Sequence, residues 1–222
     1  MKRTCRYLPL LVLSLACIPY AGAQSSVDFQ LGFGTAHDKS TGAGIESDLN
    51  SPNAFGVCAI SSSPTCKQTP SLSGFFLGFG ADIMLSKHFG VGGEASVTPV
   101  KRDYGPLQFR QTFYDFNAIL APVNEKKVAV QLQGGIGGAK TGFSFTSSGC
   151  VGTAVCSTSS QPVGSSNHFQ IHAGVGIQVY INEHVFIRPQ FDLHYVPSFT
   201  DQFGSNVSPG AMVYIGYTIG DR

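Results

Sequence analysis

The sequence predicts an all-β fold: an eight-stranded antiparallel up-and-down transmembrane β-barrel that follows a cleaved signal peptide. Three observations favour this fold class. The N-terminal residues have the pattern of an export signal, eight later segments alternate between apolar and polar residues, and the connections between these segments are short and long in turn. A barrel is a form in which such strands can cross a bilayer, because it pairs all of its backbone groups and has no open edge.

Residues 1–23 are expected to form the signal peptide. Three basic residues precede the apolar run Leu8 to Ala16, which is too short to span a bilayer as a helix. The small residues Ala21-Gly22-Ala23 predict cleavage between Ala23 and Gln24. Cys17 fits a lipoprotein signal poorly, so we expect it to be removed with the peptide. The mature domain is then residues 24–222.

The composition of the mature chain restricts the class of protein. Without the signal peptide, 11 Lys and Arg stand against 13 Asp and Glu, a formal net charge of −2. This chain has no basic surplus, so nucleic acid is not an expected partner. Charged residues make up only 12% of the chain, about half the usual share of a soluble domain. No later segment has the ~18 apolar residues of a membrane helix. This composition is compatible with a membrane protein that crosses the bilayer as a β-barrel.

Eight segments alternate as strands with one apolar and one polar face. The clearest runs from His168 to Ile181, where the odd positions from Phe169 onward are apolar and the even positions carry Gln, His, Gly and Tyr. Its length suits a tilted membrane strand better than a soluble one. In chain order, the segments are 27–34, 75–83, 91–98, 108–122, 128–137, 168–181, 185–195 and 211–219.

The connections between the segments are sorted by length. The tight ones are 86–88, 123–127 and 182–184, and the long ones are 36–71, 100–107, 142–167 and 198–208. In an outer-membrane barrel the short turns face the periplasm and the long loops face outside, whereas a soluble sandwich has no reason to sort its loops. The bulky apolar face is therefore expected to point to lipid and the polar face to the lumen. A soluble barrel with an apolar interior is the alternative.

The chain resembles the OmpA/OmpX-like superfamily of eight-stranded outer-membrane β-barrels (the outer membrane protein β-barrel domain) over residues 24–222. The resemblance is carried by LSKHFGVGGEASV, VYINEHVFIRPQFDLHYV and AMVYIGYTIG. It implies a location in the outer membrane of a Gram-negative bacterium, with lipid and lipopolysaccharide around the barrel and the barrel insertion machinery as a partner. Such barrels usually end on an aromatic residue. This chain ends on Ile219-Gly220-Asp221-Arg222, so we expect recognition to use Tyr217 and Ile219.

Four cysteines lie in two of the long loops, Cys58 and Cys66 in the first and Cys150 and Cys156 in the third. Both loops are rich in Ser, Thr, Gly and Pro, which predicts irregular structure. The exported compartment is oxidising, so disulfides are expected. The short spacing favours pairing within each loop, worth about 2–2.5 kcal/mol for each bridge on the entropic model. Bridges between the loops and metal binding by the thiols are the alternatives.

A polar network is expected to fill and plug the lumen. Arg188 is the main inward cation, and we expect it to form an ion pair with Asp82, Asp115 or, preferably, Glu94, because an unpaired charge in a narrow lumen is costly. The residues expected in this network are Asp82, Glu94, Asp115, Gln131, Gln133, His172, Gln178, Arg188, Gln190, Asp192 and His194.

Two histidines are expected to face each other across one hairpin. If the hairpin 169–195 is symmetric about Glu183, His172 lies opposite His194, with Asp192 on the same face. This group could hold a metal ion or relay a proton. The alternative is a hydrogen-bonded set of polar side chains without a metal.

A non-enzymatic surface barrel is the function that the sequence favours, with no catalytic residue and no cofactor. Loops 36–71 and 142–167 would bind an extracellular ligand in an adhesive role, or the barrel would support the envelope. The loops show neither a dense aromatic cluster nor a patch of one charge, so no ligand class is implied. A narrow pore or a route for small hydrophobic molecules is the alternative, since Pro189 could weaken local pairing. A lipid-modifying enzyme is less favoured, because the histidines are expected in the lumen.

Overall fold

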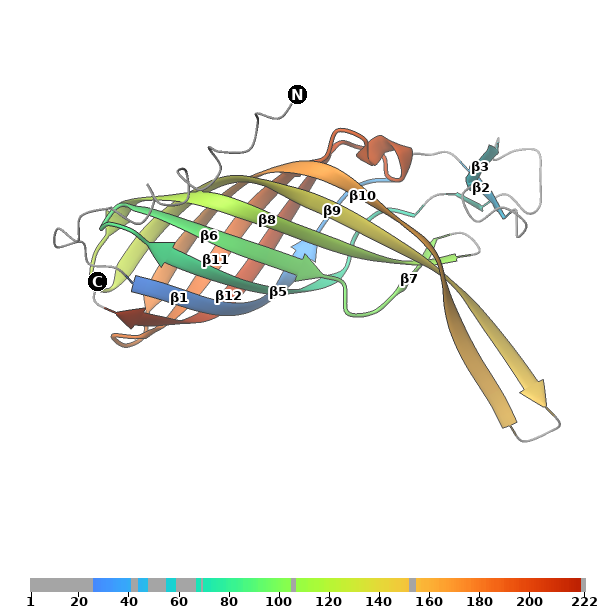
Figure 1. Cartoon of the computed structure of the whole chain (residues 1–222), viewed down its shortest axis with the longest axis horizontal. Coiled ribbons are helices and arrows are strands. Elements are labelled where there is room, and N and C mark those ends of the chain that lie inside the picture. The colour runs from blue at the N-terminus through green and yellow to red at the C-terminus, as the bar shows by residue number, and fades with distance from the viewer. Residues whose placement is uncertain are drawn as a thin grey trace, which may run out of the picture.

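Eight long strands close into an antiparallel barrel (Figure 1). The structure is a computed structural model that describes residues 26–40, 44–47, 55–58, 67–68, 70–104, 107–151 and 155–220. Each barrel strand pairs with the barrel strand before it in the chain, and β1 pairs with β12 to close the ring. The barrel strands are β1 (Ser26–Ala36), β5 (Phe75–Met84), β6 (Phe89–Val97), β8 (Leu107–Asn124), β9 (Val128–Val151), β10 (Val155–Tyr180), β11 (Val185–Tyr195) and β12 (Val207–Gly220). All eight predicted strands are thus confirmed.

The two ends of the barrel differ as the loop lengths predicted. The three short connections share one end with the start of β1 and the end of β12, where Ser26 lies opposite Gly220. These turns are tight: the Leu85 N–H donates to the Phe89 carbonyl at 2.9 Å, and the Ile181 N–H donates to the Val185 carbonyl at 2.8 Å. The long connections lie at the opposite end, called the loop end below.

The prediction that 142–167 is an irregular loop is wrong. Here β9 and β10 continue as one hairpin until Val151 lies opposite Val155. The Gly and Pro that suggested a loop are absorbed by a shift of register between Pro162 and Gly164, since a bulge accommodates a residue that lacks an N–H. Continuing the ladder pairs backbone groups of this segment that a loop would leave to water. The hairpin projects away from the barrel (Figure 1).

The first long connection also contains strands where irregular structure was expected. Within its described part, β2 (Gly44–Ser47) lies between β3 (Phe55–Cys58) and β4 (Lys67–Gln68) in a small antiparallel sheet. The other two long connections contain β7 (Arg102–Tyr104), which pairs with β8, and the 3-10 helix η2 (Phe199–Asp201).

The outward face of the barrel is apolar and the inward face is polar. Leu31 is 71% exposed and Phe116 is 73% exposed, and large apolar residues of every barrel strand share this surface. The inward positions hold buried polar side chains and glycines. A Cβ on Gly92 would lie 2.1 Å from Oδ1 of Asp82, so glycine there makes room for a polar side chain of the neighbouring strand. This distribution is opposite to that of a soluble barrel. No helix in the described part of the chain is long and apolar enough to cross a membrane.

Buried aromatic rings fill the loop end, which corrects the expectation that the loops lack a dense aromatic cluster. Tyr104 from β7 packs edge-on against Phe109 and Phe143 at ring distances of 5.6 and 5.2 Å. Phe203 contacts Tyr104 at 6.1 Å and Phe199 at 4.8 Å. This cluster could not be recognised from sequence pattern, because its members come from separate connections and strands. This mouth cluster consists of Phe76, Tyr104, Phe109, Phe113, Phe143, Phe199 and Phe203.

Candidate functional site

Arg188 lies at the centre of the lumen and is fully buried. Its Nη1 donates to Oδ2 of Asp82 and to Oε1 of Gln131, both at 2.7 Å, and its Nη2 donates to Glu94. Its guanidinium also lies over the Tyr214 ring, 5.1 Å from the centroid. The expected ion pair with Glu94 is therefore present, and Asp82 forms a second one. Even-numbered positions of β11 point inward, which is why alternation placed Arg188 correctly.

Glu94 links strands that do not pair with β6. It accepts hydrogen bonds from Nε2 of Gln30 at 3.0 Å, Nε2 of Gln190 at 2.8 Å and Nε2 of Gln133 at 3.4 Å. These amides come from β1, β11 and β9. The carboxylate therefore joins strands across the lumen through charge-assisted hydrogen bonds, which are stronger than neutral ones.

A second polar group lies between Arg188 and the turn end. Oδ1 of Asp28 accepts from the Thr218 hydroxyl at 2.6 Å, and Oδ2 accepts from Nε2 of Gln178 at 3.0 Å. Gln178 in turn accepts from Nε2 of Gln131 at 3.0 Å, which connects this group to Arg188. Asp28 was missing from the predicted network, although its inward place in the alternation of β1 could have indicated it.

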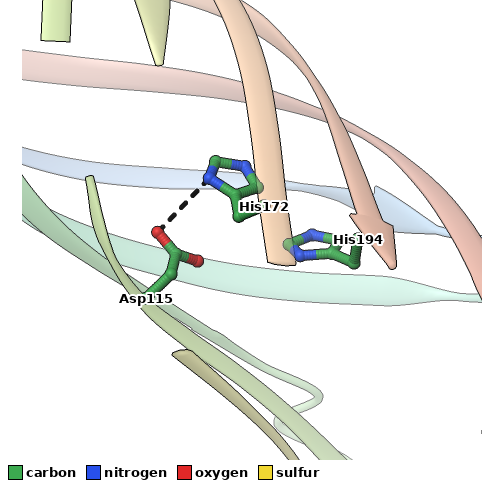
Figure 2. Close-up of side chains that lie close together, drawn as sticks. All are labelled: Asp115, His172 and His194. Carbon is green, nitrogen blue, oxygen red and sulfur yellow. Dashed lines mark ion pairs between the residues drawn. The ribbon is translucent and has the colours of Figure 1, made fainter. Parts of the chain in front are cut away.

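The histidine group is shown in Figure 2, and the course of β11 places His194 nearer the loop end than Arg188. The predicted register is confirmed: His172 on β10 lies opposite His194 on β11, and their rings stack at 5.1 Å. Nε2 of His172 lies 3.0 Å from Oδ1 of Asp192, and Nδ1 lies 2.9 Å from Oδ1 of Asn117. Both nitrogens of His172 thus face oxygen atoms.

Asp115 joins this group from β8, which is separated from β10 by the single strand β9. Its Oδ1 lies 3.4 Å from Nδ1 of His172 and accepts a hydrogen bond from Asn117. The sequence placed Asp115 among the possible partners of Arg188, whereas the structure places it beside His172. The contact between Asp115 and His172 does not follow from the register of paired strands, because β8 and β10 are not neighbours in the sheet.

His194 is held by rings instead of hydrogen bonds. It stacks on Phe113 of the mouth cluster at 4.3 Å with an interplanar angle of 9°, and its other ring neighbour is His172. Nδ1 of His194 is buried and has no hydrogen-bond partner among the described residues. Buried polar atoms are normally paired, so this nitrogen needs an explanation.

All eleven residues of the predicted lumen network are buried. They form the Arg188 group and the histidine group, and Gln190 connects the two by donating to both Glu94 and Asp192. The structure adds Asp28, Gln30, Asn117, Thr218 and Tyr214. Aromatic Tyr214 was assigned no role in the sequence, although its place between apolar outward residues of β12 indicates the lumen.

Asp38 is a titratable group at the loop end, beyond the last residue of β1. Asp38 forms a bridge with Leu72, whose carbonyl accepts from the Asp38 N–H at 2.8 Å. Burial of the side chain raises the pKa of Asp38 to about 6, and the backbone groups of Lys39 and Ser205 oppose this shift. The neutral form is therefore favoured relative to an exposed Asp.

The cysteines are only partly placed. Cys150 and Cys156 are directly opposite each other at the tip of the β9–β10 hairpin. This backbone arrangement is compatible with the expected disulfide between them. Cys58 lies in β3 opposite Gly44. Cys66 and the expected cleavage site at Ala23 and Gln24 lie outside the described residues, so the first disulfide and the signal peptide remain predictions.

The comparison with known proteins concerns the fold. No protein-family model and no curated protein matches the sequence. Among solved structures, Ail, the attachment invasion locus protein of Yersinia pestis, in complex with the heparin analogue sucrose octasulfate, has a TM-score of 0.50 and 12% identity, over 88% of this chain and 99% of Ail. OprG of Pseudomonas aeruginosa (TM-score 0.47, 15% identity, 90% and 99% of the two chains) and Neisserial surface protein A (0.46, 14%, 87% and 97%) are more distant. The chain therefore has an eight-stranded antiparallel β-barrel fold similar to that of Ail.

Proposed function

We propose that this protein is a non-enzymatic surface barrel that presents the β9–β10 hairpin for adhesion-type binding outside the cell. The observation that carries this proposal is the length of the hairpin. At the loop end, β8 last pairs with β9 at Ser144, and β11 last pairs with β10 at Ile171. Beyond these residues the two strands pair with each other, and the seven residues of β9 after Ser144 extend about 20 Å further.

The composition of the hairpin suits hydrogen bonding. Residues 141–167 contain no Asp, Glu, Lys or Arg and are rich in Ser and Thr. Among the described residues, no strand pairs with the outer edges of this hairpin beyond the barrel, and such edges can accept a further strand from a partner. A ligand would therefore be recognised by hydroxyl and backbone groups and not by charge. A disulfide between Cys150 and Cys156 would brace the tip.

A plugged lumen is the second part of the proposal. The Arg188 group, the histidine group and the mouth cluster lie in succession along the barrel, and their members are buried. A small eight-stranded barrel has room for little more than its own side chains. This favours a scaffold over the pore alternative.

The non-enzymatic part rests on the surroundings of the histidines. His172 contacts Asp192 and Asn117 instead of a serine hydroxyl, and His194 is enclosed by rings. A lipid-modifying enzyme needs its nucleophile and base at the lipid interface, whereas these side chains point into the lumen.

The test compares bacteria that display the full protein with bacteria that display a variant in which an Asn-Gly turn replaces residues 146–158. We expect attachment to host cells and to extracellular matrix to fall to the level of bacteria without the protein. A second variant replaces the same residues with an Ala/Gly segment of equal length, which removes the hydroxyl side chains, and it should also lose attachment. Retained heat-modifiability on gels shows that both barrels fold. Attachment by the shortened variant at the full level would refute the role of the hairpin.

Planar-bilayer recordings test the plug separately. A plugged lumen predicts no discrete conductance from the purified barrel. Single-channel steps, increased by Arg188→Ala, would support the pore alternative and leave the attachment test unaffected.

A further inference from the structure

We propose that the lumen contains a binding site for one divalent transition-metal ion of the Zn²⁺ type, with His172, His194 and Asp115 as ligands. This site is independent of the hairpin and of the binding proposed for it. One ligand atom from each of the three side chains lies within 4.8 Å of the other two. Figure 2 shows the two imidazole rings side by side and the carboxylate of Asp115 turned toward them. The three residues come from β10, β11 and β8, so the site forms only when these strands are assembled in one curved sheet.

The distances suit a small ion. With bond lengths of about 2.0–2.2 Å, ligand atoms around a tetrahedral Zn²⁺ lie about 3.3 Å apart. Nδ1 of His172 and Oδ1 of Asp115 are already 3.4 Å apart. The ligand atom of His194 lies within 4.8 Å of the other two, so an approach of at most about 1.5 Å completes this geometry.

The unpaired nitrogen of His194 is a separate indication of a ligand. Nδ1 is buried without a partner, and such an atom costs about 1–3 kcal/mol when it stays unsatisfied. A metal ion accepts the lone pair of a neutral imidazole and removes this cost.

A cavity adjoins the three ligands. It has a volume of about 20 Å³ and is lined by Asp115, His172, Asp192 and His194, among others. One water molecule needs about 10–15 Å³ on this measure. The space therefore suits one ion, or an ion with a water as its fourth ligand.

Asp192 has a different part from the one the sequence suggested for it. It lies 3.0 Å from Nε2 of His172, on the side of the ring away from Asp115, and Gln190 donates to it at 2.7 Å. A carboxylate that accepts the other N–H of a ligating histidine fixes the tautomer and raises the basicity of the ring. Asp192 is thus a positioning residue that leaves the Nδ1 lone pair of His172 available to the ion, on the side of the ring where Oδ1 of Asn117 lies 2.9 Å from Nδ1.

The charge of the lumen also favours a cation. Five carboxylates on the barrel strands are buried, and Arg188 is the one buried Lys or Arg side chain in the described residues. Arg188 is bound to Asp82 and Glu94, so Asp115 and Asp192 receive no charge compensation from it. Imidazole nitrogen combined with carboxylate oxygen favours Zn²⁺, Cu²⁺ or Ni²⁺ over Ca²⁺ and Mg²⁺.

The test uses the mature chain without a histidine tag, refolded into detergent with and without Zn²⁺ and then freed of unbound metal. We expect one equivalent of zinc per barrel by elemental analysis and a higher unfolding temperature of the zinc-treated protein, since an ion that binds only the folded state stabilises it. Refolding with Co²⁺ should give the visible absorption of a four-coordinate ion.

His194→Phe is the decisive variant, because Phe can keep the stack on Phe113 while it removes the ligand. We expect this variant to fold, to retain no zinc and to show no zinc-dependent stabilisation. His184→Gln, at an exposed turn, is the matched control and should bind like the unchanged chain. Asp192→Asn should weaken zinc binding about 10–100-fold.

Three results would overturn the proposal. They are a zinc content near zero in the unchanged chain, an equal zinc content in His194→Phe, and loss of binding in His184→Gln, which would place the ion on the surface. If His194→Phe fails to fold, His172→Gln is measured by the same zinc content and absorption.

Discussion

At the scale of single residues, we expect the substitution of Arg188 to have the largest effect on the stability of the barrel. It compensates Asp82 and Glu94 in a space closed to water. Arg188→Met removes the cation and leaves both acids buried, which we expect to cost about 3–5 kcal/mol of stability against urea. Arg110→Met, at an exposed position where the guanidinium donates to the Pro99 carbonyl, is the control and should change stability by less than about 0.5 kcal/mol.

The same site tests whether charge or packing is responsible. Adding Asp82→Asn and Glu94→Gln to Arg188→Met replaces the charged set with neutral groups of similar size. Much of the lost stability should return, because replacing a whole buried ion group costs less than removing one partner. If the triple variant is as unstable as the single one, the loss comes from packing around Tyr214 instead.

Asp38 predicts a pH dependence at the loop end. Its pKa is raised to about 6, so the folded state binds a proton more readily than the unfolded state between about pH 4 and 6. The stability contributed by Asp38 is therefore greater below this window and declines as the pH rises through it. Hydrogen exchange of the residue 38 amide, compared between pH 4 and 7, should show less protection at pH 7.

Asp38→Asn should remove this difference, because the amide has no charged form. Asp103→Asn, which changes an exposed acid of the neighbouring connection, should leave it in place. Equal protection of the unchanged chain at both pH values would contradict the prediction.

At the scale of elements, the β9–β10 hairpin depends on its tip. Cys150 and Cys156 are opposite residues, and a bridge between them closes a short loop. We expect non-reducing mass spectrometry of the mature protein to find a peptide that joins these two cysteines. The exchange of Cys150 and Cys156 for serine should increase proteolysis of residues 146–158 without loss of heat-modifiability. A peptide that joins Cys58 to Cys150 or Cys156 would refute pairing within the loops.

The elements also show how far sequence pattern reaches. Alternation placed the inward residues of the barrel strands correctly, Arg188 and His172 among them, because the period of two follows directly from strand geometry. The symmetric hairpin gave the opposition of His172 and His194 for the same reason. The extension of β9 and β10 was not predicted, because Ser, Thr, Gly and Pro are common in turns. These residues form a ladder here only because the two strands pair with each other.

Contacts across the lumen were beyond the reach of the sequence. Asp115 and His172 lie on strands that do not pair, so their distance depends on the curvature of the closed barrel. The mouth cluster has the same origin: Tyr104, Phe199 and Phe203 come from connections without periodicity and meet only after closure. Residues that depend on neighbouring strands were predictable, and residues that depend on the whole ring were not.

At the scale of the whole molecule, the orientation of the two faces can be tested with one outward residue. Leu31 is the middle residue of β1, is 71% exposed, and lies between Phe79 and Ile215 on the neighbouring strands. In a bilayer this position faces lipid near the midplane, so Leu31→Arg should destabilise the barrel by about 2–4 kcal/mol.

Val100→Arg is the control: Val100 is equally exposed, at 72%, but lies in a connection at the loop end, where Arg stays in water and costs little. Stability is measured by urea unfolding in lipid bilayers. In a water-soluble barrel both positions would face solvent and the two substitutions would be equivalent. A difference between two equally exposed positions therefore distinguishes lipid from water as the surroundings of the outer face, which exposure alone does not.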